Sequence, residues 1–93
     1  PRNAACQYMV ASRWVFAPGI FGNPQRGINE LEAILNGDGD PWKDDLFNIY
    51  SAIGYAYIRL KKNQDALVWV NRSLVLYPTN KFALGLLERA NVP

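Results

Sequence analysis

The fold of this chain is decided by two stretches, YSAIGYAY at residues 50–57 and ALVWVNRS at residues 66–73. Apolar residues recur in both at three- and four-residue spacing, which is typical of amphipathic helices. The small residues Gly54 and Ala66 stand where two antiparallel helices must approach closely, because a larger side chain would wedge them apart. Pro78 then ends the second helix, since proline lacks an amide donor and restricts the residue before it. The pattern predicts a helix–turn–helix hairpin.

The order of these residues resembles the tetratricopeptide repeat, a helix–turn–helix unit of about 34 residues with the pattern W-x2-L-G-x2-Y…A-x3-F…P. The resemblance is clear over residues 47–80. It implies a scaffold that holds partners rather than one that makes or breaks bonds. The chain matches the pattern by identity or by similar chemistry at Tyr50, Ile53, Gly54, Tyr57, Ala66, Val70, Ser73 and Pro78.

A divergent, expanded copy of the same unit is predicted over residues 5–36. Its extra residues fall in the two turns, at 18–22 and 37–41, and insertions at turns leave the packing of stacked repeats intact. The second half of this copy keeps the spacing of the clear unit. Gly27, Leu31 and Ile34 correspond to Ala66, Val70 and Ser73.

Local signals predict five helices. Asn23-Pro24 and Asp40-Pro41 each combine an N-cap residue with a proline at the first helical position. The third helix can also begin later, at Asp44 or Asp45, and Asn63 is predicted to cap the fourth. The helices are predicted over residues 3–17, 24–36, 41–61, 64–77 and 80–90, the last of them starting at Thr79 or Asn80. The side chains predicted to be buried between helices are Tyr50, Ile53, Tyr57, Leu67, Val70 and Leu74.

The resemblance implies an all-α fold in which antiparallel helix hairpins stack as a short right-handed solenoid. Residues 1–93 form a single domain on this interpretation, and residues 80–91 form a C-terminal capping helix. Glu88 stands where a further repeat would need glycine. This substitution predicts a polar-faced cap, which repeat arrays require for solubility.

Composition argues against several other functions. The chain has 93 residues, a net charge of +2, no histidine and one cysteine, which fits one small domain. The charge is too small to indicate nucleic-acid binding. Cys6 has no base beside it and no serine or lysine lies in an activated motif, so we expect no enzymatic activity, no catalytic residues and no cofactor.

Two further absences bear on location. No apolar run reaches the ~18 residues of a membrane span, and a single cysteine indicates no compartment. The chain does not begin with Met, which predicts a fragment or a processed form.

Four acidic residues, Asp38, Asp40, Asp44 and Asp45, superficially resemble a calcium-binding loop. They lack the required spacing and the glutamate at the twelfth position. Caps and first helical turns explain the carboxylates, because helix N-termini favour negative charge. We therefore expect no metal site.

The resemblance also implies a binding site, because tetratricopeptide domains hold extended or helical peptides on the concave surface lined by the first helix of each repeat. Arg59 there suits a carboxylate, whereas Ala52 occupies an asparagine position of the chaperone-tail binders and argues against that subtype. An alternative is that Tyr55 and Ile58 simply pack on the N-terminal hairpin. The groove-facing positions are Asn48, Ser51, Ala52, Tyr55, Ile58 and Arg59.

The predicted function is a non-catalytic module for protein interaction or assembly, with a protein or peptide as partner. One alternative is a homo-oligomeric scaffold that self-associates through the N-terminal helix, since an apolar face with no cover normally marks an interface. Another alternative is an exported helical domain that binds a small molecule near Trp14 and Phe21. The residues of the N-terminal apolar face are Tyr8, Met9, Trp14 and Phe16.

Overall fold

The computed structural model of the chain describes residues 8, 11–13, 15–16, 22–37 and 42–91. Within these residues the regular structure is all helix, without a strand. Residues 8, 11–13 and 15–16 are helical and are called the N-terminal helical segment. With this segment the described chain forms a compact, all-α domain of five helical elements. The other four helices are α2 (Pro24–Leu35), α3 (Lys43–Arg59), α4 (Asn63–Leu76) and α5 (Lys81–Ala90).

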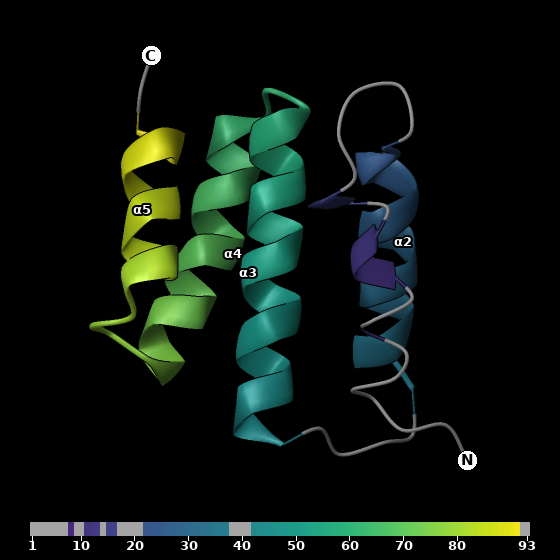
Figure 1. Cartoon of the computed structure of the whole chain (residues 1–93), viewed down its shortest axis with the longest axis horizontal. Coiled ribbons are helices and arrows are strands. Elements are labelled where there is room, and N and C mark those ends of the chain that lie inside the picture. The colour runs from purple at the N-terminus through teal and green to yellow at the C-terminus, as the bar shows by residue number, and fades with distance from the viewer. Residues whose placement is uncertain (1–7, 9–10, 14, 17–21, 38–41, 92–93) are drawn as a thin grey trace.

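Each helix packs against the next one along the chain, and α3 also contacts α5 across the intervening α4. Figure 1 shows the helices roughly parallel to one another, with α5 on one side, α2 on the other, and α3 and α4 between them. The body is flat, with extents of 42 × 32 × 18 Å. The main apolar cluster joins the N-terminal helical segment, α2 and α3, and its largest members include Ile28, Leu31, Ile49 and Ile53.

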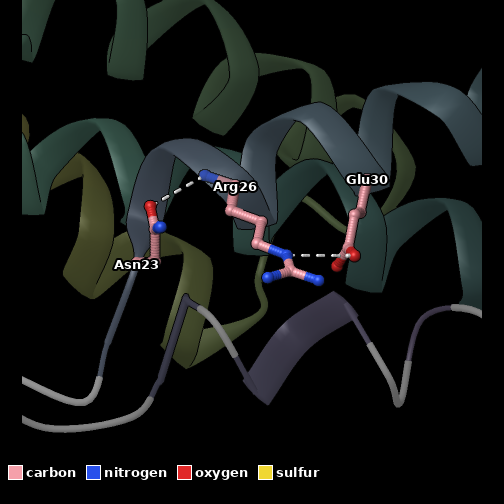
Figure 2. Close-up of polar contacts among 3 residues, drawn as sticks. All are labelled: Asn23, Arg26 and Glu30. Carbon is pink, nitrogen blue, oxygen red and sulfur yellow. Dashed lines mark hydrogen bonds and ion pairs between the residues drawn. The ribbon is translucent and has the colours of Figure 1, made fainter.

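Helix α2 begins as the Asn23-Pro24 pair predicts. The Asn23 side chain accepts a hydrogen bond from the backbone N–H of Arg26 at 3.1 Å, and Pro24 is the first helical residue. Figure 2 shows this cap together with the ion pair between Arg26 Nε and Glu30 Oε1, 3.5 Å apart. Both side chains of the pair are partly exposed, so the pair contributes little. The cap is the interaction that fixes where α2 starts.

Asn23→Ala is expected to lower the free energy of unfolding by about 1 kcal/mol, because it leaves an amide of the first turn without its acceptor. Urea denaturation followed by circular dichroism measures this change. Asn29→Ala is the matched control, since Asn29 is exposed in the middle of the same helix. Equal losses for both variants would contradict a capping role for Asn23.

Helices α3 and α4 meet at Gly54. A Cβ atom built on Gly54 would lie 2.7 Å from Val70 Cγ2, 3.4 Å from the Val70 amide nitrogen and 3.6 Å from the Ala66 carbonyl oxygen. Ala66 and Val70 are both fully buried. The close approach predicted from Gly54 and Ala66 is therefore present, and the Val70 side chain, with the backbone of α4 behind it, fills the space that a side chain at residue 54 would need.

The turn between α3 and α4 corrects the predicted boundaries. Helix α3 ends at Arg59, and Lys61 takes a left-handed conformation with φ of 61°. The Lys62 amide bonds to the carbonyl of Tyr57 and the Lys61 amide to that of Ile58, which together form a Schellman motif. Lys62 is the N-cap of α4, so Asn63 is its first helical residue and the predicted cap at Asn63 is wrong.

The start of α3 and the end of α4 are held together by Tyr77. This residue follows the last helical residue of α4 in a non-helical conformation (φ −137°, ψ 83°), in keeping with the bias away from the helical region for the position before a proline. Its hydroxyl donates a hydrogen bond to Asp44, and its ring meets Phe47 edge-on at 5.2 Å. The bond to Asp44 raises the pKa of the Tyr77 hydroxyl.

Helix α3 begins at Lys43, between the two predicted starts, and places Asp44 and Asp45 in its first turn. Carboxylates in a first turn are favourable because they lie near the positive end of the helix dipole. Asp38, Asp40 and Pro41 lie outside the described residues.

The predicted core is confirmed in part. Ile53 and Val70 are fully buried, whereas Tyr50, Tyr57, Leu67 and Leu74 are half-buried. The rings lie at the edges of the helix contacts, as in the tilted pair of Tyr50 and Trp69 at 6.0 Å. Burial raises the pKa of the Tyr57 hydroxyl, and the nearby Glu32 and Asp65 raise it further.

Candidate partner-binding face

The six predicted groove positions lie on α3 but differ in accessibility. Ser51 and Ala52 are buried, with exposed fractions of 3% and 0%, whereas the other four are half-buried. The Ser51 hydroxyl donates to the backbone carbonyl of Asn48 at 3.2 Å and is satisfied within its own helix. A partner that leaves the helices in place cannot reach Ser51 or Ala52. The positions with accessible surface are Asn48, Tyr55, Ile58 and Arg59.

Tyr55 is the centre of this face, because residues from three elements meet on it. Its ring stacks on Phe16 of the N-terminal helical segment, with 5.1 Å between centroids and 15° between planes. The guanidinium of Arg89 on α5 lies 5.3 Å from the centroid of the same ring. We call Phe16, Tyr55 and Arg89 the aromatic–arginine cluster. Tyr55 therefore packs on the N-terminal helical segment and also keeps accessible surface.

Arg59 serves the fold as well as the surface. Its Nη1 donates a hydrogen bond to the carbonyl oxygen of Val15. Val15 is fully buried in the N-terminal helical segment, so the bond ties the last turn of α3 to that segment. A cation near the last helical turn is also favoured by the helix dipole. The Arg59 guanidinium is therefore already engaged inside the chain.

The aromatic–arginine cluster keeps accessible surface. Phe16 is 42% exposed, Arg89 is exposed, and Tyr55 is half-buried between them. Among the described residues Arg89 forms no ion pair with a carboxylate. A guanidinium stacked on a ring keeps its N–H donors directed outward, where they can bind a carboxylate. The cluster thus offers a cation and two ring surfaces at one point.

Sequence reasoning missed Arg89, although a signal for it exists. Arg89 follows Tyr55 by 34 residues, which is one period of the resembled repeat. The same offset relates Asn48 to Phe82, which is 48% exposed. Positions one period after the groove residues of α3 therefore indicate the residues of α5 that share its face.

The N-terminal apolar face is partly turned inward. Tyr8 packs against the main apolar cluster, and this burial raises the pKa of its hydroxyl. Phe16 is the ring that stacks on Tyr55. The other two residues predicted for this face, Met9 and Trp14, lie outside the described residues, as do Cys6 and Phe21. Of the described members, only Phe16 retains a large exposed fraction.

Two other features are absent from the described part of the chain. No helix there is long and apolar enough to cross a membrane. No group of three or more acidic, histidine or cysteine side chains in that part is arranged to hold a metal ion. The aromatic–arginine cluster is one of three places in that part of the chain where a cation lies over an aromatic ring. The other two pair Lys43 with Tyr77 and Arg72 with Trp69. The aromatic–arginine cluster is the one that joins three helical elements.

Comparison of the chain with protein-family models, curated proteins and solved structures gives no match. The function of this chain must therefore be inferred from its own geometry.

Proposed function

We propose that this chain is a tetratricopeptide-like, non-catalytic binding module that holds an acidic peptide or helix on the face formed by the N-terminal helical segment, α3 and α5. The observation that carries the proposal is the meeting of Phe16, Tyr55 and Arg89 on one point of that face. These residues come from three separate elements, so a ligand bound there contacts the N-terminal helical segment, α3 and α5 together.

The helix order supports the repeat-like part of the proposal. In stacked helical hairpins, the first helices of successive units line one surface, and the second helices line the other. The N-terminal helical segment, α3 and α5 occupy the first-helix places, and α3 contacts α5 across α4. The contact of Gly54 with Val70 and Ala66 is the close approach that the repeat pattern requires within one unit.

The chemistry of the face supports a peptide partner. Tyrosine and arginine are enriched among residues that dominate binding energy, because they combine a large apolar surface with directional polar groups. Arg89 provides the charge and Phe16 and Tyr55 provide the ring surface. An acidic side chain next to an apolar one satisfies both, and this motif defines the partner class.

The test is selection of binders from a random peptide library, followed by affinity measurements with fluorescence polarisation. The selected peptides are expected to be enriched in Asp and Glu. Tyr55→Ala and Arg89→Glu should each weaken binding by about 30-fold, the effect of losing a dominant interface residue. Circular dichroism checks that both variants remain folded.

Val75→Ala is the matched control, since Val75 is 80% exposed on α4, a second-helix position. It should bind the selected peptides as the native chain does. Failure to select any peptide, or equal binding by the native chain and both cluster variants, would refute the proposal.

A further inference from the structure

The outer face of α5 carries a set of residues that the fold does not explain. Ala83, Leu86 and Ala90 form the buried face of this helix. On the opposite side Leu84 is 40% exposed, Gly85 is half-exposed, and both charged residues are exposed. The outer residues, spaced by three, one and three positions, are Lys81, Leu84, Gly85 and Glu88.

Gly85 has no role within the chain that requires a glycine. A glycine inside a helix costs about 1 kcal/mol relative to alanine. At Gly54 the close approach of Val70 explains that cost, but a Cβ atom on Gly85 would meet nothing within 4 Å. Gly85 lies inside the helix and does not have a positive φ. A bare backbone on an outer face permits another helix to approach closely.

The charges of Lys81 and Glu88 are placed unfavourably with respect to the dipole of their own helix. Lys81 is the first residue of α5 and Glu88 lies near its end. Helix dipoles favour the reverse, with anions at the N-terminus and cations at the C-terminus. An antiparallel neighbouring helix would correct both placements, because its C-terminus would lie beside Lys81 and its N-terminus beside Glu88.

The positions of these four residues are symmetric about the point midway between Leu84 and Gly85. We propose that α5 pairs in antiparallel fashion with α5 of a second copy, about a two-fold axis through this point. Each Lys81 then lies opposite Glu88 of the second copy, and the reverse pair follows by symmetry, as in any isologous interface. The two Leu84 side chains meet on one side of the axis, and the two Gly85 backbones approach on the other.

The predicted dimer is weak because the contact area is small. A ten-residue helix is about 15 Å long, so the contact is smaller than the ~800 Å² per partner of a standard interface. The dimer therefore forms at high local concentration of the chain. Arg89 lies one helical turn after Gly85, at the border of this interface, with its guanidinium over the Tyr55 ring. The pairing does not depend on the function proposed for the aromatic–arginine cluster.

Sedimentation equilibrium between about 10 μM and about 1 mM tests the pairing, since small interfaces dissociate in this range. The native chain is expected to show a monomer–dimer equilibrium. Lys81→Glu alone and Glu88→Lys alone should each weaken it about tenfold, because two attractive contacts become repulsive. The double variant K81E/E88K should restore native association.

Gly85→Ala separates association from folding. It should raise the thermal midpoint of the monomer, since the space above Gly85 is open and alanine is the better helix former. The same change should weaken the dimer, because its methyl group lies in the line of approach.

Two results would overturn the pairing. One is a monomer at every concentration. The other is a dimer whose dissociation constant is unchanged by all of these substitutions in α5. If Phe16→Ser abolishes such a dimer, the interface lies on the N-terminal helical segment instead.

Discussion

Gly54→Leu is expected to lower the free energy of unfolding by about 3 kcal/mol, and Gly54→Ala by about 1 kcal/mol, because overpacking outweighs the gain in helix propensity. Even the first added carbon would lie 2.7 Å from Val70 Cγ2, and the Val70 amide and Ala66 carbonyl close the remaining space. The helices must separate to admit a longer side chain. Urea denaturation followed by circular dichroism measures both losses.

Two further variants make this prediction specific. In a double-mutant cycle, Val70→Ala should offset part of the loss caused by Gly54→Ala, since it removes the methyl group that the new Cβ meets. Gly85→Ala is the matched control at a glycine with open space, and it should stabilise the chain. If both glycine-to-alanine changes stabilise the chain equally, then α3 and α4 do not depend on a close approach at Gly54.

Ile53→Ala is expected to lower the free energy of unfolding by about 3 kcal/mol, because it removes a buried branched side chain and leaves a cavity. Ile53 is fully buried in the cluster that joins the N-terminal helical segment, α2 and α3. Thermal and urea denaturation should agree on the loss. Val75→Ala, at a site that is 80% exposed, should stay within about 0.5 kcal/mol of the native chain.

A similar loss in Ile53→Ala and Val75→Ala would show that the apolar cluster around α3 is not the main source of stability. A large loss of stability in Ile53→Ala alone supports the apolar cluster as the main source of stability. The contrast also checks that Val75→Ala is a suitable control for the binding experiment.

The helix starts that sequence alone predicts are those with local causes. Helix α2 starts after Asn23 and α5 starts after Asn80. Both starts can be predicted because an N-cap side chain binds amides only two or three residues away. The Asn80 side chain accepts from the Ala83 amide at 3.1 Å, as this geometry requires. The hairpin of α3 and α4 is likewise indicated by Gly54 and Ala66, because small residues at these positions mark where two helices can approach closely.

Other features depend on contacts that the local sequence does not encode. The turn after α3 is closed by Lys61 in a left-handed conformation, where glycine would be the usual signal. The burial of Ser51 and Ala52, and the position of Arg89 over Tyr55, depend on how α3, α5 and the N-terminal helical segment cross. The sequence signal for the position of Arg89 over Tyr55 is the 34-residue offset between them.

A slab that measures 18 Å across its thinnest dimension is less than two helix widths deep. Helix α3 is still enclosed by its neighbours, since none of its residues after Asp44 is exposed, whereas α2, α4 and α5 each keep exposed residues. Exposed residues on the two broad surfaces can change independently, because the shared apolar cluster between the helices is built from other, buried side chains. The architecture allows one surface to acquire a new ligand while the opposite surface retains its own.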